Sequence, residues 1–254
     1  MRKVSSYEDV FINIGCQSFS ILLLTVHMEY YKPAGPILAT FMEILMLSLR
    51  TITSSLLQTN CYLLVDEQVK EAVLIDAPYG IADDVARELE KYQARLTHII
   101  LTHGHFDHTM DSPILKERFG ADIWMHESDW KFATEPESQG IPFFYLGIEV
   151  DSFTPDRILA TTQHISIGIT EYQIISTPGH TPGGICLYSA SENRLFTGDT
   201  LFAGTWGRTD YAGGDDTEMA NSLRQLGKMA PSTHFFPGHG QSSTICDEQW
   251  LSSV

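Results

Sequence analysis

The sequence predicts a layered α/β protein in which two β-sheets pack face to face and helices cover the outer faces. Short β-rich runs and amphipathic helical segments follow one another from residue 46 onward, and this plan occurs once in each half of that region. The chain has 254 residues, of which 43% are hydrophobic, so it can bury a full-sized core. These observations exclude a disordered or fibrous protein.

The first half begins with alternating apolar residues that predict three strands, an amphipathic helix and a buried strand THIIL that ends at Leu101. A second helix follows, and Gly120 is its predicted C-cap. The predicted strands lie near residues 47–53, 59–65, 71–76, 97–101 and 121–126, and the helices near 81–93 and 112–119.

The second half repeats this style after a less regular stretch that reaches residue 156 and resembles a lid or substrate loop. Pro136, Gly140 and Pro142 interrupt any regular pattern there. The strands predicted beyond it lie near residues 172–176, 184–189, 194–198 and 233–236, and the helix near 216–228.

Residues 1–45 differ from the remainder. The run 10–28 has no Asp, Glu, Lys or Arg, which is a feature of signal peptides and membrane anchors. Asn13 and Gln17 interrupt it, however, and no small-residue cleavage site follows. We therefore expect 1–45 to be a dispensable extension, with Met46 as a candidate true start, and 46–254 to be the functional domain.

The net charge and the cysteine content limit the classes of partner and the cellular compartment that fit this protein. The chain has 16 Lys and Arg against 32 Asp and Glu, a formal charge of -16, which repels nucleic acid and anionic membranes. Its four cysteines are far apart in the sequence and form no CxxC pair. This pattern predicts free thiols and a cytoplasmic protein without nucleic-acid or membrane partners.

A cluster of metal-binding residue types follows the buried strand that ends at Leu101. His103, His105, Asp107 and His108 lie within six positions, and Gly104 allows the tight turn that brings imidazoles together. Imidazole and carboxylate ligands together suit zinc, iron or manganese.

Three further residues have a similar setting. His180, Asp199 and His239 each follow a predicted strand and a glycine, so each can project into a shared rim. The remaining histidines of the domain lack this setting and are expected in structural roles. Among them, His98 and His234 are the candidates for supporting contacts to the ligands.

The motifs HGHFDH, GH, GD and PGHG, in this order, resemble those of the metallo-β-lactamase superfamily. The resemblance implies a four-layer αββα sandwich with a binuclear metal site, most simply two zinc ions, at one edge of the sheets. It also implies that Asp76 supports the metal-binding loop. The implied ligands are His103, His105 and His180 for the first ion, Asp107, His108 and His239 for the second, and Asp199 as the bridge between them.

Two metal ions can generate a hydroxide, so the predicted reaction is metal-assisted hydrolysis with Asp107 and Asp199 as catalytic residues. The sequence has no GxSxG nucleophile motif. GDTLFAG followed by GRTD resembles the hydroxyacylglutathione hydrolases, which implies a small-molecule thioester substrate. In the two-domain enzymes a basic residue near Arg208 contacts glutathione, so Arg208 is the substrate-binding candidate; the alternative is a structural pair with Asp210.

The sequence departs from that group in three places. Only 15 residues follow His239, so we expect the C-terminal helical domain of the two-domain enzymes to be absent, and Asp210 replaces a tyrosine although Tyr211 is adjacent. Asp111, in the segment Met110-Asp111-Ser112, adds a carboxylate near the metals where small residues are usual.

Two alternatives stay open at this point. One is a persulfide dioxygenase, in which His103, His180 and Asp199 would hold a single iron as a facial triad. The other is a non-enzymatic metal- or partner-binding domain.

Overall fold

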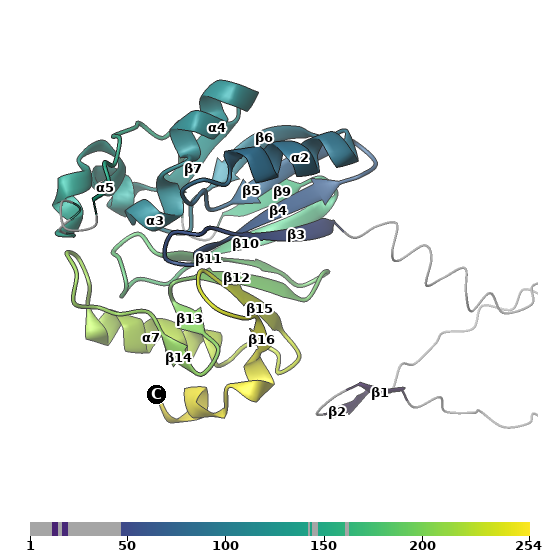
Figure 1. Ribbon diagram of the computed structural model, residues 1–254. Coiled ribbons are helices and arrows are strands. Elements are labelled where there is room, and N and C mark those ends of the chain that lie inside the picture. Colours follow the sequence, from purple (N-terminus) through teal and green to yellow (C-terminus); the bar gives the residue numbers. More distant parts are fainter. Residues whose placement is uncertain (1–11, 15–16, 20–46, 142, 144–146, 161–162) are drawn as a thin grey trace, which may run out of the picture. The chain divides into compact units, whose positions relative to one another are not determined.

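The structure is a computed structural model that describes residues 12–14, 17–19, 47–141, 143, 147–160 and 163–254 (Figure 1). The chain divides into two units, Met1–Ile44 and Leu45–Val254. In the first unit, β1 (Ile12–Ile14) pairs antiparallel with β2 (Gln17–Phe19). The rest of the predicted extension and Met46 lie outside the described residues, so the dispensability of 1–45 stays a prediction. None of the described helices is both long and apolar enough to cross a membrane.

The first sheet of the second unit has six strands in the order β3-β4-β5-β6-β7-β8. The pairs β3·β4 and β4·β5 are antiparallel, whereas β5 to β8 run parallel. The strands are β3 (Ser48–Thr53), β4 (Asn60–Asp66), β5 (Glu71–Ile75), β6 (Arg95–Ile100), β7 (Asp122–His126) and β8 (Arg157–Leu159).

The second sheet also has six strands, in the order β16-β15-β12-β11-β10-β9. All its neighbours are antiparallel except β12 and β15, which are parallel. The strands are β9 (His164–Ile167), β10 (Thr170–Ser176), β11 (Ile185–Ser189), β12 (Arg194–Gly198), β15 (His234–Pro237) and β16 (Ser243–Thr244); β13 (Leu201–Phe202) and β14 (Thr205–Trp206) form a separate hairpin.

Helices cover the outer faces of both sheets, so the layers run helix, sheet, sheet, helix (Figure 1). On the side of the first sheet lie α2 (Ala82–Tyr92), α3 (Phe106–Thr109), α4 (Ser112–Phe119), η1 (Glu127–Asp129), α5 (Trp130–Thr134) and η2 (Pro136–Gln139). On the side of the second sheet lie α7 (Asp216–Leu226), η3 (Ile245–Asp247) and η4 (Gln249–Ser253). The predicted αββα sandwich is confirmed.

The layers follow from the two-residue period of the strands. In β4, Cys61, Leu63 and Val65 pack toward the helices, whereas Tyr62 and Leu64 pack between the two sheets. Both faces of this strand are therefore apolar, as expected for a strand covered on both sides. Cys61, Cys186 and Cys246 are free thiols, as predicted, and Cys16 lies outside the described residues.

The predicted elements are found close to their expected positions, but several short ones were missed. The strands β8, β9 and β16 and the β13–β14 hairpin have only two to four residues each, too few to show a period. Residues 106–109, expected as loop, form the single turn α3. The irregular stretch after residue 126 begins with η1, α5 and η2, and part of it lies outside the described residues.

Asp111, the additional carboxylate near the predicted metal ligands, has a structural role. Its buried carboxylate accepts hydrogen bonds from the backbone N–H groups of Gly80, Ile81 and Ala82, at 2.8–3.0 Å. These donors are at the N-terminus of α2, which has no side-chain cap of its own. Asp111 therefore caps α2 from a distant part of the sequence.

Candidate metal centre

The seven predicted ligands lie at the carboxyl ends of four strands. His103 and His105 follow β6, and Asp107 and His108 extend from the turn α3 directly after them. His180, Asp199 and His239 follow β10, β12 and β15, respectively, in the second sheet. All are buried except His239, whose side chain is 27% exposed. Both sheets therefore contribute to one rim, as the sequence predicted.

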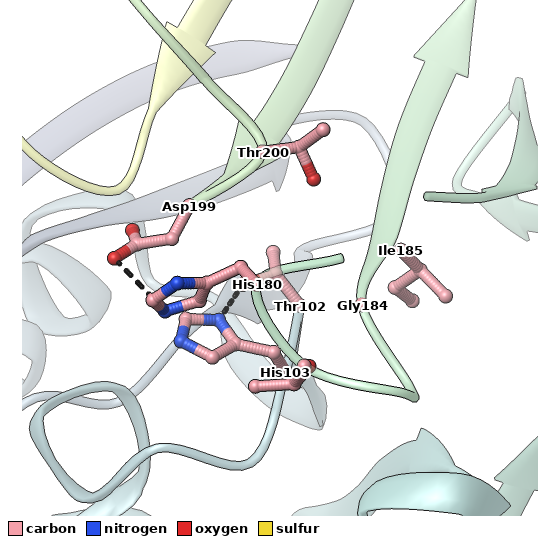
Figure 2. Close-up of a pocket in the computed structure, with 8 residues that line it drawn as sticks. Thr102, His103, His180, Gly184, Ile185, Asp199 and Thr200 are labelled. Atoms are coloured by element: carbon pink, nitrogen blue, oxygen red, sulfur yellow. Dashed lines mark hydrogen bonds and ion pairs between the residues drawn. The ribbon is translucent and has the colours of Figure 1, made fainter. Parts of the chain in front are cut away.

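The side chains converge into three groups that could each hold an ion, with candidate ligand atoms within 4.8 Å of one another. The groups are His103, His105 and His180; His103, His108 and Asp199; and Asp107, His108 and His239. Figure 2 shows the imidazoles of His103 and His180 side by side, with the Asp199 carboxylate turned toward His180.

Asp199 lies between the first and the last of these groups. Its Oδ2 is 3.5 Å from His180 Nε2 and 3.4 Å from His239 Nε2, and its Oδ1 is 3.3 Å from His108 Nε2. One carboxylate thus faces ligands of both predicted ions, which is the geometry that a bridging ligand requires.

Hydrogen bonds on the outer side of the rings orient the imidazoles. His180 Nδ1–H donates to the Arg208 carbonyl at 2.6 Å, and His239 Nδ1–H donates to the Leu57 carbonyl at 3.2 Å. A carbonyl can only accept, so the tautomer is inferred from the partner. In the neutral rings the Nε2 lone pairs then face the centre, as metal binding requires.

Asp76 performs the same task for His103 and His108. Its Oδ2 accepts from His108 Nδ1–H and from the Thr102 hydroxyl, both at 2.8 Å, and its Oδ1 accepts from the Thr102 N–H at 2.7 Å. Since the Thr102 proton is committed to Asp76, its oxygen accepts from His103 Nδ1–H at 3.2 Å. Asp76 reaches this position through a left-handed backbone, φ 61°, which aspartate tolerates better than most residues.

The donor set fits a cation. His105 Nδ1 and His180 Nε2 are only 2.8 Å apart, and the latter has a lone pair because its proton is on Nδ1. His103 Nε2 is buried without a hydrogen-bond partner. Burial lowers the pKa of His103 well below its usual range and that of His105 to about 3, so both rings are neutral ligands at physiological pH.

In the other half of the centre, the pKa values of the two histidines are shifted upward. Burial alone would lower the pKa of His108 and His239, but carboxylates outweigh it. Asp199 and Asp107 raise the pKa of His108 well above its usual range and raise that of His239 to about 9. The same contacts hold the pKa of Asp199 well below its usual range in spite of its burial. Without metal, protons on these two imidazoles neutralise the carboxylates.

These protons predict a pH-dependent metal affinity. Metal binding needs neutral imidazoles, so at pH 7.5 we expect binding to release at least about two protons, from His108 and His239. The affinity should fall about tenfold per pH unit for each released proton as the pH decreases, and release should vanish above the pKa values of the metal-free protein. Titration calorimetry in buffers of different ionisation enthalpy measures the proton count; a count of zero would contradict this electrostatic account.

The sequence did not predict several supporting contacts. Buried Thr59, just before β4, donates its hydroxyl proton to Asp107 Oδ2 at 3.1 Å, and it forms a β-bridge with His239. The Leu57 carbonyl is likewise a backbone partner without a sequence signal. The glycine at position 238 is itself visible in the sequence, and the structure explains it: a Cβ there would overlap the Asp199 carboxylate and lie 2.6 Å from His108 Cε1.

Arg208 lies beside the centre, and its side chain is half exposed. It forms a bidentate ion pair with Asp210, with distances of 2.5 Å for Nε–Oδ1 and 2.6 Å for Nη2–Oδ2. Its guanidinium also stacks on the Tyr211 ring, 4.1 Å from the ring centre. This ion pair with Asp210 is the structural role that the sequence offered as the alternative to substrate binding by Arg208. In addition, the Arg208 carbonyl orients His180. The Tyr211 ring is also nearly perpendicular to that of His105, with ring centres 6.1 Å apart.

His98 and His234, the two candidates for supporting contacts, have other contacts in the structure. His98 stacks on Trp124 with ring centres 4.1 Å apart, within the first sheet, and burial lowers its pKa to about 4. His234 begins β15, is exposed, and contacts Phe236. Both positions precede the loops at the strand ends, so the side chains do not reach the ligands.

Comparison with known proteins identifies the family. The family model described as the metallo-beta-lactamase superfamily matches residues 55–239. The chain belongs to the metallo-beta-lactamase superfamily. Members are metal-binding hydrolases as a rule. Hydroxyacylglutathione hydrolase GloC from Haemophilus influenzae is 34% identical over 205 residues, which cover 80% of this chain and 95% of that protein.

Solved structures of the superfamily share the fold. The BLEG-1 B3 metallo-beta-lactamase superposes with a TM-score of 0.74 at 30% identity and covers 81% of this chain and 100% of its own. TTHA1623 in a di-iron-bound form gives 0.67 at 28% identity, with 78% and 96% covered. ETHE1 from Myxococcus xanthus gives 0.66 at 26% identity, with 80% and 81% covered.

Proposed function

We propose that this protein is a binuclear metal-dependent thioester hydrolase, active in the cytoplasm on hydroxyacylglutathione or a related small thioester. The observation that carries the proposal is the Asp199 carboxylate, which faces His180 and His108 with its two oxygens at 3.5 and 3.3 Å. The proposed ligands of two zinc ions are His103, His105 and His180 on one side, Asp107, His108 and His239 on the other, and Asp199 between them.

Two divalent ions held by these residues would supply a hydroxide at neutral pH and would polarise the scissile carbonyl. The protein's own contribution is position. Asp107 Oδ2 is fixed by the Thr59 hydroxyl at 3.1 Å and lies 3.2 Å from His239 Nε2, so its other oxygen is available to orient the attacking water. We propose Asp107 and Asp199 as the catalytic carboxylates.

Thioester chemistry suits a site of this kind. A thiol of ordinary pKa, about 8.5, leaves as a thiolate with little help from a general acid, whereas an amide nitrogen needs a proton. The GDTLFAG and GRTD motifs and the 34% identity to hydroxyacylglutathione hydrolase GloC support the choice of a glutathione thioester.

Arg208 is the proposed contact for a substrate carboxylate. To bind it, the guanidinium would exchange Asp210 for the substrate, which the half-exposed position of the pair permits. Arg208→Ala is therefore expected to raise KM about tenfold and to change kcat little, because the contact is equal in ground and transition states. Arg87→Ala, which removes an exposed arginine of α2 paired with Asp84, is the matched control and should leave both constants unchanged. Unchanged kinetics in Arg208→Ala would assign Arg208 to a structural role.

The activity is tested with zinc-loaded protein and lactoylglutathione, beside a simple acyl thioester, a β-lactam and a lactone. We expect thioester hydrolysis with kcat/KM of at least about 10⁴ M⁻¹s⁻¹, and much weaker turnover of the other substrates. Faster hydrolysis of the β-lactam would instead favour the activity named for BLEG-1. Undetectable turnover of every substrate would favour the non-enzymatic alternative.

A persulfide dioxygenase is the second candidate, because of the likeness to ETHE1. It would use one iron held by His103, His180 and Asp199, the combination of ligands typical of oxygen-activating iron sites. Oxygen uptake with glutathione persulfide by iron-loaded protein, without thioester hydrolysis, would decide for this candidate.

A further inference from the structure

We propose that Asp129 is a positioning residue that joins the two loops of the first metal set, His103, His105 and His180, and thereby sets the affinity of that set. The inference rests on the proposed metal centre but not on the choice of substrate. Asp129 ends η1, in the stretch that the sequence assigned to a substrate loop, and it is fully buried.

The Asp129 carboxylate accepts three hydrogen bonds from both loops. Oδ2 accepts from the Gly104 N–H at 2.8 Å and from the Thr181 hydroxyl at 2.7 Å, and Oδ1 accepts from the Gly183 N–H at 2.6 Å. Gly104 lies between His103 and His105, and Thr181 directly follows His180. One side chain thus holds the neighbours of all three proposed ligands.

The packing around the carboxylate leaves no room for side chains on the loop glycines. A Cβ at Gly104 would lie 2.9 Å from Phe132 Cβ and 3.0 Å from the Asp129 carbonyl oxygen, and one at Gly183 would lie 2.7 Å from Asp129 Oδ1. Phe132, three residues after Asp129, also stacks on His105 with ring centres 5.8 Å apart. The glycines of both loops therefore serve the close approach to η1 and α5, in addition to the turns themselves.

The consequence concerns the distance between the two loops. His105 Nδ1 and His180 Nε2 come from opposite loops and lie 2.8 Å apart before any ion is bound. Without the Asp129 carboxylate, the three donors lose their acceptor and the two loops are no longer held together. Metal binding would then have to bring the loops together itself, which would lower the metal affinity. Partners of this kind typically contribute about 10- to 100-fold to metal affinity.

Asp129→Asn tests the inference with little change in volume. An amide nitrogen would face at least one of the three donors, so at least one hydrogen bond is lost. We expect zinc competition with a chromogenic chelator to show one of the two ions bound about 10- to 100-fold more weakly. In the metal-free protein, the amides of Gly104 and Gly183 should exchange hydrogen faster than in the wild type.

The matched control is Glu192→Gln. Glu192 is also buried and accepts from the Leu47 N–H at 2.7 Å and from the Tyr172 hydroxyl and Arg194 at 2.8 Å. It precedes β12, whose other end leads to Asp199, so it lies away from the metal loops. We expect it to lower stability without a change in metal affinity.

Thr181→Val provides a milder variant if Asp129→Asn does not fold, because it removes only the hydroxyl donor. It should weaken the same ion by a smaller factor. Wild-type affinity for both ions in the folded variant tested would overturn the proposal. Selective loss of one ion would support it even if the wild-type protein hydrolysed no thioester, so this proposal and the proposed function can fail separately.

Discussion

Asp199→Ala is expected to lower thioester hydrolysis by on the order of a thousandfold or more, the largest effect of any single substitution. Asp199 is the proposed carboxylate bridge between the two metal sets, with contacts of 3.3–3.5 Å to His108, His180 and His239. Its loss would remove the ligand shared by the two proposed ions, so that the hydroxide and the polarisation of the carbonyl that they would supply would no longer be held in register.

The fold should survive this change, because Asp199 lies in a loop at the strand end, and His108 and His239 keep their contacts with Asp76 and Asp107. Circular dichroism and the unfolding midpoint check this. Asp122→Ala, which removes an exposed carboxylate at the start of β7, is the control and should retain full activity. An active Asp199→Ala variant with two bound ions would defeat the assignment of the bridge.

Asp76→Ala is expected to affect both stability and metal binding. The substitution leaves the Thr102 N–H and the His108 Nδ1–H without their acceptor in a buried site, since Asp76 is 1% exposed. We expect a loss of about 3 kcal/mol in the free energy of unfolding of the metal-free protein. Metal affinity should fall about 10- to 100-fold, because His103 and His108 both lose the orientation that Asp76 provides.

Denaturant titration and chelator competition measure the two effects. Glu192→Gln again separates them: it also perturbs a buried, multiply hydrogen-bonded carboxylate, and it should lower stability alone. Equal metal affinity in Asp76→Ala and Glu192→Gln would show that Asp76 contributes to the fold and not to the centre.

The sequence predicted the layers, and the meeting of seven His and Asp side chains at one rim, because both leave local signals. Alternation in β4 distinguishes its two apolar faces, and a glycine beside each ligand-bearing turn marks the ends of β6, β10, β12 and β15. These signals need only a few neighbouring residues. The seven side chains that they single out do meet at one rim of the structure.

The supporting contacts could not be predicted in this way. Asp129 contacts Gly104, Thr181 and Gly183, which are 25, 52 and 54 positions away in the sequence. Its local sequence, Glu127-Ser128-Asp129, is typical of an exposed turn. The carbonyls of Leu57 and Arg208 orient His239 and His180, yet any residue has a carbonyl. The role of Asp111 was not predicted for the same reason, since its partners at the start of α2 lie about 30 positions away.

The central claim is that two ions share this centre. Elemental analysis of protein purified without added metal tests it most directly. We predict about two ions per chain, zinc or a mixture of zinc and iron, falling in Asp129→Asn to about one after mild chelation. A single iron per chain, with Asp107, His108 and His239 left free, would contradict the binuclear hydrolase and favour the dioxygenase.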